Sequence, residues 1–233
     1  MWRLKQGGYV HHKTRTLPIF CGVRSNETEA PGSPSMSESA VEKGELHIHL
    51  NGAVPARTVL EILAEEGTDI MAGFNPERDL VRRLPCSSLG EYLRPWELLR
   101  RLPKRQENLQ RLVNSAVDEL YTQGLRFVEF RSSVLYLATL QECSVPEALH
   151  RLITCINQAT KLYAMRWGLI LTVTRGDYSA VHLAALLSAY DSLDRPKEIV
   201  GIDLAGDEDI PYPIDLPRLF RKAKDDFGLG VTI

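Results

Sequence analysis

Two histidines separated by a single residue are the clearest chemical signal in this sequence. They lie in the stretch Glu-Leu-His-Ile-His-Leu-Asn-Gly at residues 45–52. Side chains alternate between the two faces of a β-strand, so His47 and His49 share one face with Asn51, while aliphatic residues form the other. Two imidazoles on one face of a strand can hold a metal ion. The alternative is an ordinary strand with one solvated face.

The overall composition is typical of a globular protein. The chain has 233 residues, of which 44% are hydrophobic and 25% charged, and a net charge of −2 argues against a dedicated nucleic-acid partner. No apolar run reaches about 18 residues, so we expect no transmembrane helix and no membrane partner. The four cysteines form no Cys-x-x-Cys pair, which favours reduced thiols and a cytoplasmic location.

Residues 1–43 differ in composition from the rest of the chain. No acidic residue precedes Glu27, and residues 25–38 are rich in Asn, Glu, Pro, Gly and Ser. Such a segment buries too little apolar surface to offset the entropy of ordering, so we predict a poorly ordered N-terminal arm. Two origins are open for this arm: an organellar targeting segment, or a translation start placed upstream of a true start at Met36.

Residues 44–233 alternate between short apolar segments and longer helical patterns, which is typical of an α/β fold with parallel strands. The expected strands are 45–52, 125–132, 168–175, 199–206 and a shortened one at 230–233. The expected helices are 54–66, 89–102, 107–123, 146–165, 179–192 and 217–227. Residues 68–88 show no period and are expected to be irregular.

Polar residues gather at the C-terminal ends of the predicted strands. They are His49, Asn51, Arg131, Arg175, Asp203 and Gly206. Active sites form at this end of a (β/α)₈ barrel, and ligands of open doubly wound sheets also bind there. The sequence lacks a glycine-rich phosphate loop, which favours the barrel. We therefore predict an incomplete (β/α)₈ TIM barrel of about four and a half strand–helix units.

Two motifs, in this order, closely resemble the adenosine/AMP deaminase family of metal-dependent TIM-barrel hydrolases. The first is the histidine stretch at 45–52, and the second is Ile-Asp-Leu-Ala-Gly-Asp-Glu at 202–208. The similarity runs from about Gly44 to the last residue. It implies a catalytic Zn²⁺ bound by His47 and His49, a contact of Asn51 with the sugar end of a nucleoside, and a hydrogen bond from the Gly206 backbone to the purine ring.

A further likeness involves a short apolar stripe. Leu89, Tyr92, Leu93 and Trp96 share one face of a predicted helix, and the stripe is similar to the family's lid over the substrate; plain core packing is the alternative. Arg131 and Arg175 match strand-end arginines of the family, for which we expect a role in bracing carboxylates.

The resemblance implies zinc-dependent hydrolytic deamination of a small-molecule purine nucleoside, adenosine to inosine plus ammonia. The other possibilities are deamination of adenine or of an N6-substituted AMP, and a non-catalytic remnant or binding module. Asn51 is uncharged, so it does not repel a 5′-phosphate and can donate a hydrogen bond to a 5′-hydroxyl.

The chain ends at Ile233, where family members continue into His-Ala-Gly-Glu. That segment supplies a third zinc histidine and the glutamate proton donor. We therefore expect a truncated deaminase that has no catalytic acid of its own and no deaminase activity by itself.

Overall fold

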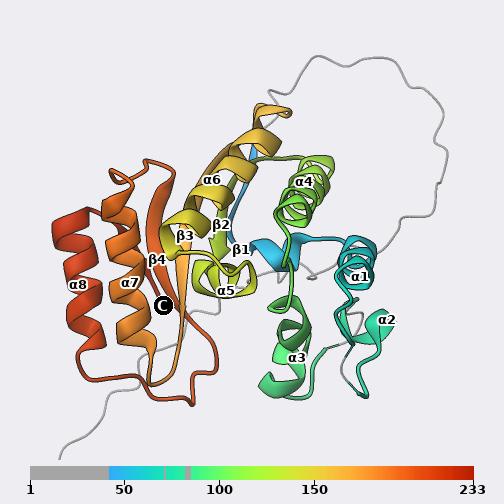
Figure 1. Ribbon diagram of the computed structural model, residues 1–233, viewed down its shortest axis with the longest axis horizontal. Helices are drawn as coiled ribbons and strands as arrows, with labels where there is room; N and C mark the ends of the chain where they lie inside the picture. The colour runs from blue at the N-terminus through green and yellow to red at the C-terminus, as the bar shows by residue number, and fades with distance from the viewer. Residues whose placement is uncertain (1–41, 71, 82–84) are drawn as a thin grey trace, which may run out of the picture.

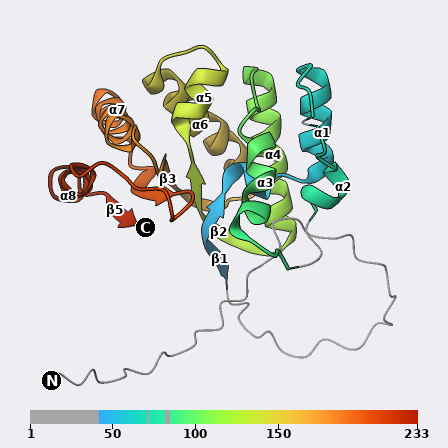
Figure 2. The ribbon, with the colours of Figure 1, turned by 90° about the horizontal axis from the view of Figure 1, so that it is seen from below.

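The centre of the molecule is a curled parallel β-sheet. The computed structural model describes residues 42–70, 72–81 and 85–233. Within them the five strands lie side by side in chain order. Their bounds are β1 Lys43–His49, β2 Leu125–Ser132, β3 Arg166–Thr174, β4 Ile199–Ala205 and β5 Gly230–Thr232. The ribbon in Figure 1 and the view along the sheet in Figure 2 show helices on the outer, convex side of the curl. The predicted incomplete TIM barrel is confirmed.

Helices alternate with these strands. Their bounds are η1 Leu50–Ala53 (a 3₁₀ turn), α1 Ala56–Glu65, α2 Pro76–Asp79, α3 Leu89–Leu99, α4 Gln106–Thr122, α5 Val134–Leu140, α6 Val145–Lys161, α7 Ser179–Ser192 and α8 Leu216–Phe227. The six predicted helices are present, with ends that differ by up to four residues. The sequence analysis missed α5, because seven residues are too few to show an amphipathic period. It also missed α2, which lies within the stretch that was predicted to be irregular.

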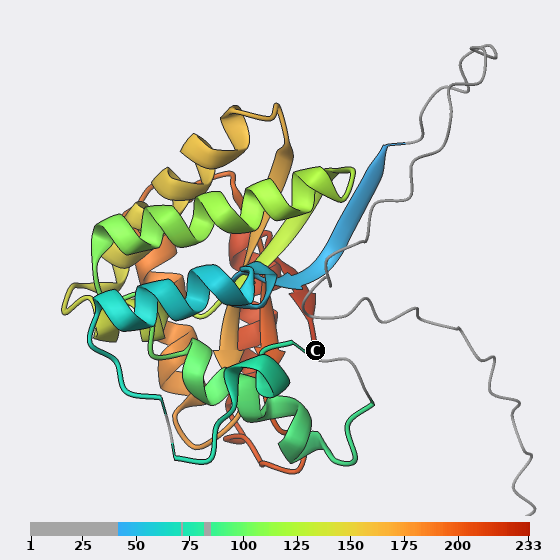
Figure 3. The same cartoon turned by 90° about the vertical axis from the view of Figure 1, so that its right-hand side faces the viewer.

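The hydrophobic core fills the space between the sheet and the outer helices. Val128 and Phe130 of β2 and Leu169 and Leu171 of β3 are fully buried on the side that faces α4, α6 and α7. Alternate residues of the same strands point to the concave side of the sheet, as strand geometry requires. Helix α3 lies apart from the outer layer, beyond the C-terminal ends of the strands (Figure 3).

The first strand is shorter than predicted. β1 ends at His49, and Asn51 lies in the 3₁₀ turn η1 rather than on the strand. The prediction that Asn51 shares a strand face with the histidines was therefore wrong. The turn buries Leu50 and Ala53 against the core, and this burial outweighs continued strand pairing, which periodicity alone could not reveal.

The predicted arm at residues 1–43 lies outside the described residues except for its last two, and Lys43 already belongs to β1. In the part of the chain that is described, none of the helices is both long enough and apolar enough to cross a lipid bilayer. Of the described cysteines, Cys143 and Cys155 are free thiols.

The start of α4 is capped by a carboxylate from another helix. Glu66, directly after α1, accepts hydrogen bonds from the backbone N–H groups of Lys104 and Arg105 and from the Asn108 amide, at 2.8–3.1 Å. The N-cap residue itself, Arg105, makes no side-chain cap. Glu66 therefore stabilises the positive end of α4 and fixes α1 against it.

Replacing Glu66 with Ala is expected to lower the free energy of unfolding by about 1–2 kcal/mol, because three donors lose their acceptor at a helix N-terminus. Urea denaturation measures the change. Glu65→Ala is the matched control, since Glu65 forms a surface ion pair with Arg111 that is worth less than about 1 kcal/mol. Equal losses in the two variants would contradict the capping role.

Candidate functional site

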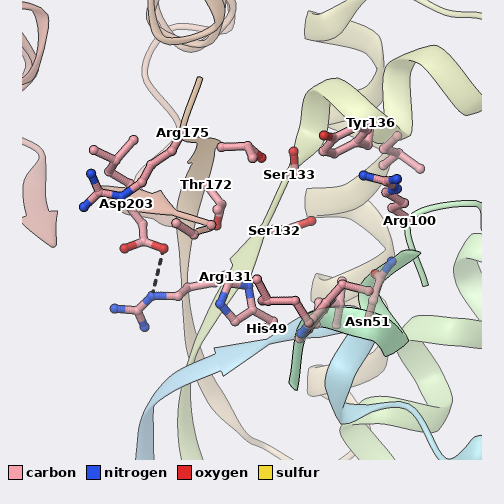
Figure 4. Close-up of a pocket in the computed structure, with 18 of the residues that line it drawn as sticks. His49, Asn51, Arg100, Arg131, Ser132, Ser133, Tyr136, Thr172, Arg175 and Asp203 are labelled. Atoms are coloured by element: carbon pink, nitrogen blue, oxygen red, sulfur yellow. Dashed lines mark ion pairs between the residues drawn. The ribbon is translucent and has the colours of Figure 1, made fainter. Parts of the chain in front are cut away.

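A cavity of about 500 Å³ opens at the C-terminal ends of the strands. Its volume lies within the range of about 300–1,000 Å³ that is common for small-molecule sites. The sequence-predicted site residues all line it: His47, His49, Asn51, Leu89, Tyr92, Leu93, Trp96 and Gly206. Figure 4 shows the polar part of this lining. The structure thus brings together residues that are up to 159 positions apart in the chain, between His47 and Gly206.

The two histidines of β1 point into this cavity. Their ring centroids are 5.8 Å apart and the rings are tilted by 53°. Burial lowers the pKa of His49 to about 4, and burial together with the Arg131 guanidinium lowers the pKa of His47. Both imidazoles are therefore neutral at pH 7, which is the form that binds a metal.

The spacing of these rings suits a shared zinc ion. Zn–N bonds of about 2.0–2.1 Å at a tetrahedral angle place two bound imidazole centroids roughly 5 Å apart, close to the observed separation. Within the described residues, no group of three or more His, Cys, Asp or Glu side chains is arranged to hold a metal. The spacing fits His47 and His49 as two ligands of a zinc ion. Catalytic zinc sites commonly have three protein ligands, so these two histidines would form part of such a site.

Beside the histidines, a buried charge pair connects four strands. The Arg131 guanidinium lies 3.4 Å from Asp203 Oδ2 and donates hydrogen bonds to the Leu46 carbonyl (2.8 Å) and to Thr232 Oγ1 (3.2 Å). Thr232 in turn donates to Asp203 Oδ1 at 2.7 Å. Arg131 and Asp203 are each only 4% exposed. The prediction that Arg131 braces a strand-end carboxylate is confirmed.

Arg175, the second arginine that was predicted to brace a carboxylate, has a different partner. The Arg175 guanidinium lies over the Tyr212 ring, 5.6 Å from its centroid, and none of the ion pairs between described residues involves it. A cation–π contact with the segment after β4 replaces the expected carboxylate partner.

Asn51 is oriented by the chain around it. Its Nδ2 donates to the Leu99 carbonyl at 2.9 Å and to the Leu102 carbonyl at 3.4 Å. Carbonyl oxygens can only accept, so the amide nitrogen must face them and Oδ1 is left for a ligand. The predicted donation from Asn51 to a 5′-hydroxyl would have to compete with these two hydrogen bonds, so we expect Oδ1 to make the ligand contact.

The apolar stripe of α3 forms one wall of the cavity. Trp96 meets His49 edge to face, with 5.1 Å between ring centroids, while Leu89 and Tyr92 are 45% and 38% exposed. Residues in plain core packing would be buried, so this exposure favours the lid interpretation of the stripe over the core interpretation.

Gly206 ends β4 with a φ of +115°, a conformation that L side chains rarely adopt. A Cβ at this position would lie 3.4 Å from Thr174 Cγ2 and 3.5 Å from the Arg175 nitrogen. The position therefore requires glycine, and its backbone stays accessible from the cavity.

Sequence reasoning missed several polar lining residues, namely Arg100, Ser132, Ser133, Tyr136 and Thr172. The strand-end rule could have found the two serines, because Ser132 is the last residue of β2 and Ser133 follows it directly. Tyr136 was missed together with α5, and Arg100 was taken as part of the predicted helix at 89–102.

Comparisons with known proteins decide the family. The sequence profile described as adenosine deaminase matches residues 42–232. The chain belongs to the adenosine deaminase family. It is 26% identical over 207 residues to an adenosine deaminase of Clostridium botulinum, covering 85% of this chain and 59% of that protein. It is 30% identical over 205 residues to an adenosine deaminase of Clostridium perfringens, covering 82% and 57%.

Solved structures of other proteins share the fold of this adenosine deaminase family member. A zinc-bound amidohydrolase from Burkholderia ambifaria has a TM-score of 0.68 at 20% identity, with 82% of this chain and 51% of that chain covered. Arabidopsis ADAL complexed with GMP has a TM-score of 0.66 at 19% identity, covering 82% and 56%. The present chain spans less than three-fifths of the length of these relatives.

Proposed function

We propose that residues 44–233 form the N-terminal part of a zinc-dependent deaminase barrel, preceded by the arm at 1–43, and that the complete site converts an adenine nucleoside to the inosine compound and ammonia. The observation that carries this proposal is the meeting of the His47–His49 pair with Asn51 and Gly206 in one cavity. Membership of the adenosine deaminase family supports the reaction type.

Each lining residue then has a distinct task. His47 and His49 would hold the zinc, which would supply a water molecule with a pKa of about 7 as the nucleophile for C6 of the adenine ring. The Gly206 backbone N–H hydrogen-bonds the purine ring, and Asn51 Oδ1 accepts a hydrogen bond from a ribose hydroxyl. The apolar face of α3 excludes bulk water from the bound base, which strengthens these polar contacts.

The names of the structural relatives support a 6-aminopurine substrate. They include an adenine deaminase from Arthrobacter aurescens and an N6-mAMP deaminase from Arabidopsis. By their names, the first acts on adenine itself and the second on an adenine ring that carries a ribose phosphate. The adenine ring is therefore the common element that we propose for this site.

Zinc binding by the purified chain tests the metal part of this proposal. Even the loss of an outer-shell partner lowers metal affinity by about 10–100-fold. His47→Ala and His49→Ala are therefore each expected to weaken zinc binding at least about tenfold, measured by equilibrium dialysis and elemental analysis. His182→Ala is the matched control, because His182 stacks on Tyr178 and does not line the cavity.

Zinc affinity that is unchanged in both β1 variants would contradict the assignment. Ammonia release from adenosine, measured on the same samples, tests the expectation that this chain alone is inactive. Ammonia release that depends on His49 would overturn that expectation and still support the site.

A further inference from the structure

Helix α7 is apolar on the side that faces solvent. In its first ten residues the exposed positions are Val181, Ala184 and Ser188, and Val181 is 66% exposed. A helix that is apolar on all sides is normally covered by other parts of a protein. α7 packs against α6 on one side and α8 on the other, so its exposed face belongs to the outer surface of the helix layer and not to an open edge of the sheet.

Large apolar side chains continue this surface at the start of α7 and in the segment between β4 and α8. They are Tyr178, Ile210, Tyr212 and Ile214, which are 72%, 43%, 45% and 100% exposed. The contact of the Arg175 guanidinium with the Tyr212 ring connects the two segments, and Figure 1 shows α7 and α8 beginning at the same end of the molecule. An exposed apolar patch of this kind marks an interaction surface.

The charges next to this patch are separated by sign. The segment at 207–215 carries Asp207, Glu208, Asp209 and Asp215 and no basic residue. The exposed face of α8 that follows carries Arg218, Arg221 and Lys222, spaced by three and four residues. Arg218 lies in the first turn of α8, which has no acidic residue and where the helix dipole disfavours a cation. These charges are therefore not arranged to stabilise α8 itself.

The levels of the two helices can be compared through one contact between them. The rings of Tyr190 and Phe227 lie 6.1 Å apart, and each residue comes eleven positions after the first residue of its helix. The helices therefore run side by side without a shift, and Val181 and Arg218 lie at the same level. We call the outward surface of α7 and α8, together with residues 207–215, the α7–α8 face.

This face is complementary to itself under a two-fold rotation. An axis that lies in the face and crosses both helices at the level of Val181 and Arg218 would lay each helix antiparallel on its own counterpart. Val181 would then meet Val181 of the other copy. Asp215 precedes this level by as many residues as Arg221 follows it, so the acidic residue of one copy would meet the basic residue of the other.

We propose that the α7–α8 face binds a second copy of this chain and forms a two-fold symmetric dimer. The occupant is a second copy because the face itself supplies both the acidic and the basic half of the contact. Apolar residues at the centre and charged residues around them are the usual pattern of a protein interface. Glu208 of the acidic segment also lines the cavity, so the dimer would hold one rim of that cavity in place.

Sedimentation velocity over a range of protein concentrations tests this proposal, and a species with twice the mass of the 26.2 kDa chain is expected. Val181→Arg places two like charges against each other on the axis, so the dissociation constant of the dimer should rise at least about a hundredfold. Leu162→Arg is the matched control, because Leu162 is 76% exposed at the end of α6 and lies outside the α7–α8 face. It should leave the dimer unchanged.

A charge swap tests the two-fold arrangement. Asp215→Arg and Arg221→Asp should each raise the dissociation constant about tenfold, because each brings like charges together. The double variant should restore the dimer, since each changed residue meets the other changed residue of the second copy. Circular dichroism checks that the variants are folded. A wild-type chain that stays monomeric, or a dimer that Val181→Arg leaves intact, overturns the proposal. A double variant that dimerises no better than the single variants overturns the two-fold arrangement.

Discussion

Replacing Arg131 with Met is expected to lower the free energy of unfolding by about 3–5 kcal/mol, because one partner of a buried charge pair is removed. Asp203 would stay buried with only the Thr232 hydroxyl as donor, and the Leu46 carbonyl would lose its side-chain hydrogen bond. Urea denaturation with linear extrapolation measures the loss.

Two further variants separate the buried charge from a general effect of losing an arginine. Arg166→Met removes an exposed ion pair with Glu42 on the same sheet and should change the free energy by less than about 1 kcal/mol. The double variant Arg131→Met with Asp203→Asn removes the unpaired charge and should recover part of the loss. A loss below about 1 kcal/mol in Arg131→Met, or no recovery in the double variant, would rule out this account.

Asn51→Asp is expected to cost about 2–4 kcal/mol of stability, although the two side chains have nearly the same shape. The substitution replaces an amide donor by a carboxylate that faces the Leu99 and Leu102 carbonyls, so three acceptors would share one space without a donor. The end of α3 should detach from η1, which amide hydrogen exchange over α3 would reveal.

The same substitution has a second expected result at the ligand. A carboxylate at position 51 repels a phosphate, so the binding of IMP should fall more than the binding of inosine, which lacks the phosphate. Asn114→Asp is the matched control, because Asn114 is an exposed residue of α4 that only accepts from Gln110. If Asn51→Asp leaves α3 protected from exchange and weakens the binding of both probes equally, two claims are wrong: that the Asn51 amide holds the end of α3, and that Asn51 influences substrate choice.

The sequence predicted the barrel class and the strand that carries the histidines, because both depend on periodicity. Alternation along β1 determines that His47 and His49 share a face, and buried strands alternate with amphipathic helices throughout. The Gly206 position was predictable in the same way, since it follows an apolar strand directly.

Contacts between distant segments could not be predicted in this way. The orientation of the Asn51 amide depends on two carbonyls 48 and 51 residues away, and no local pattern encodes them. Arg100 at the end of α3 and Tyr136 in α5 line the same cavity, and α5 is too short to show a period. Tertiary packing, rather than any signal around Arg100 or Tyr136, places these side chains in the cavity.

The order of the strands in the sheet has a consequence for how the protein folds. Each strand pairs with its predecessor in the chain, and the contact between Thr232 and Asp203 spans only 29 residues. The link between Arg131 and Leu46 spans 85 residues, because the described residues between β1 and β2 include the four α-helices α1 to α4. Longer loops cost more entropy to close and slow the pairing. The histidine strand should therefore be the last to gain protection during refolding, so that the metal-binding face is completed on a preformed sheet.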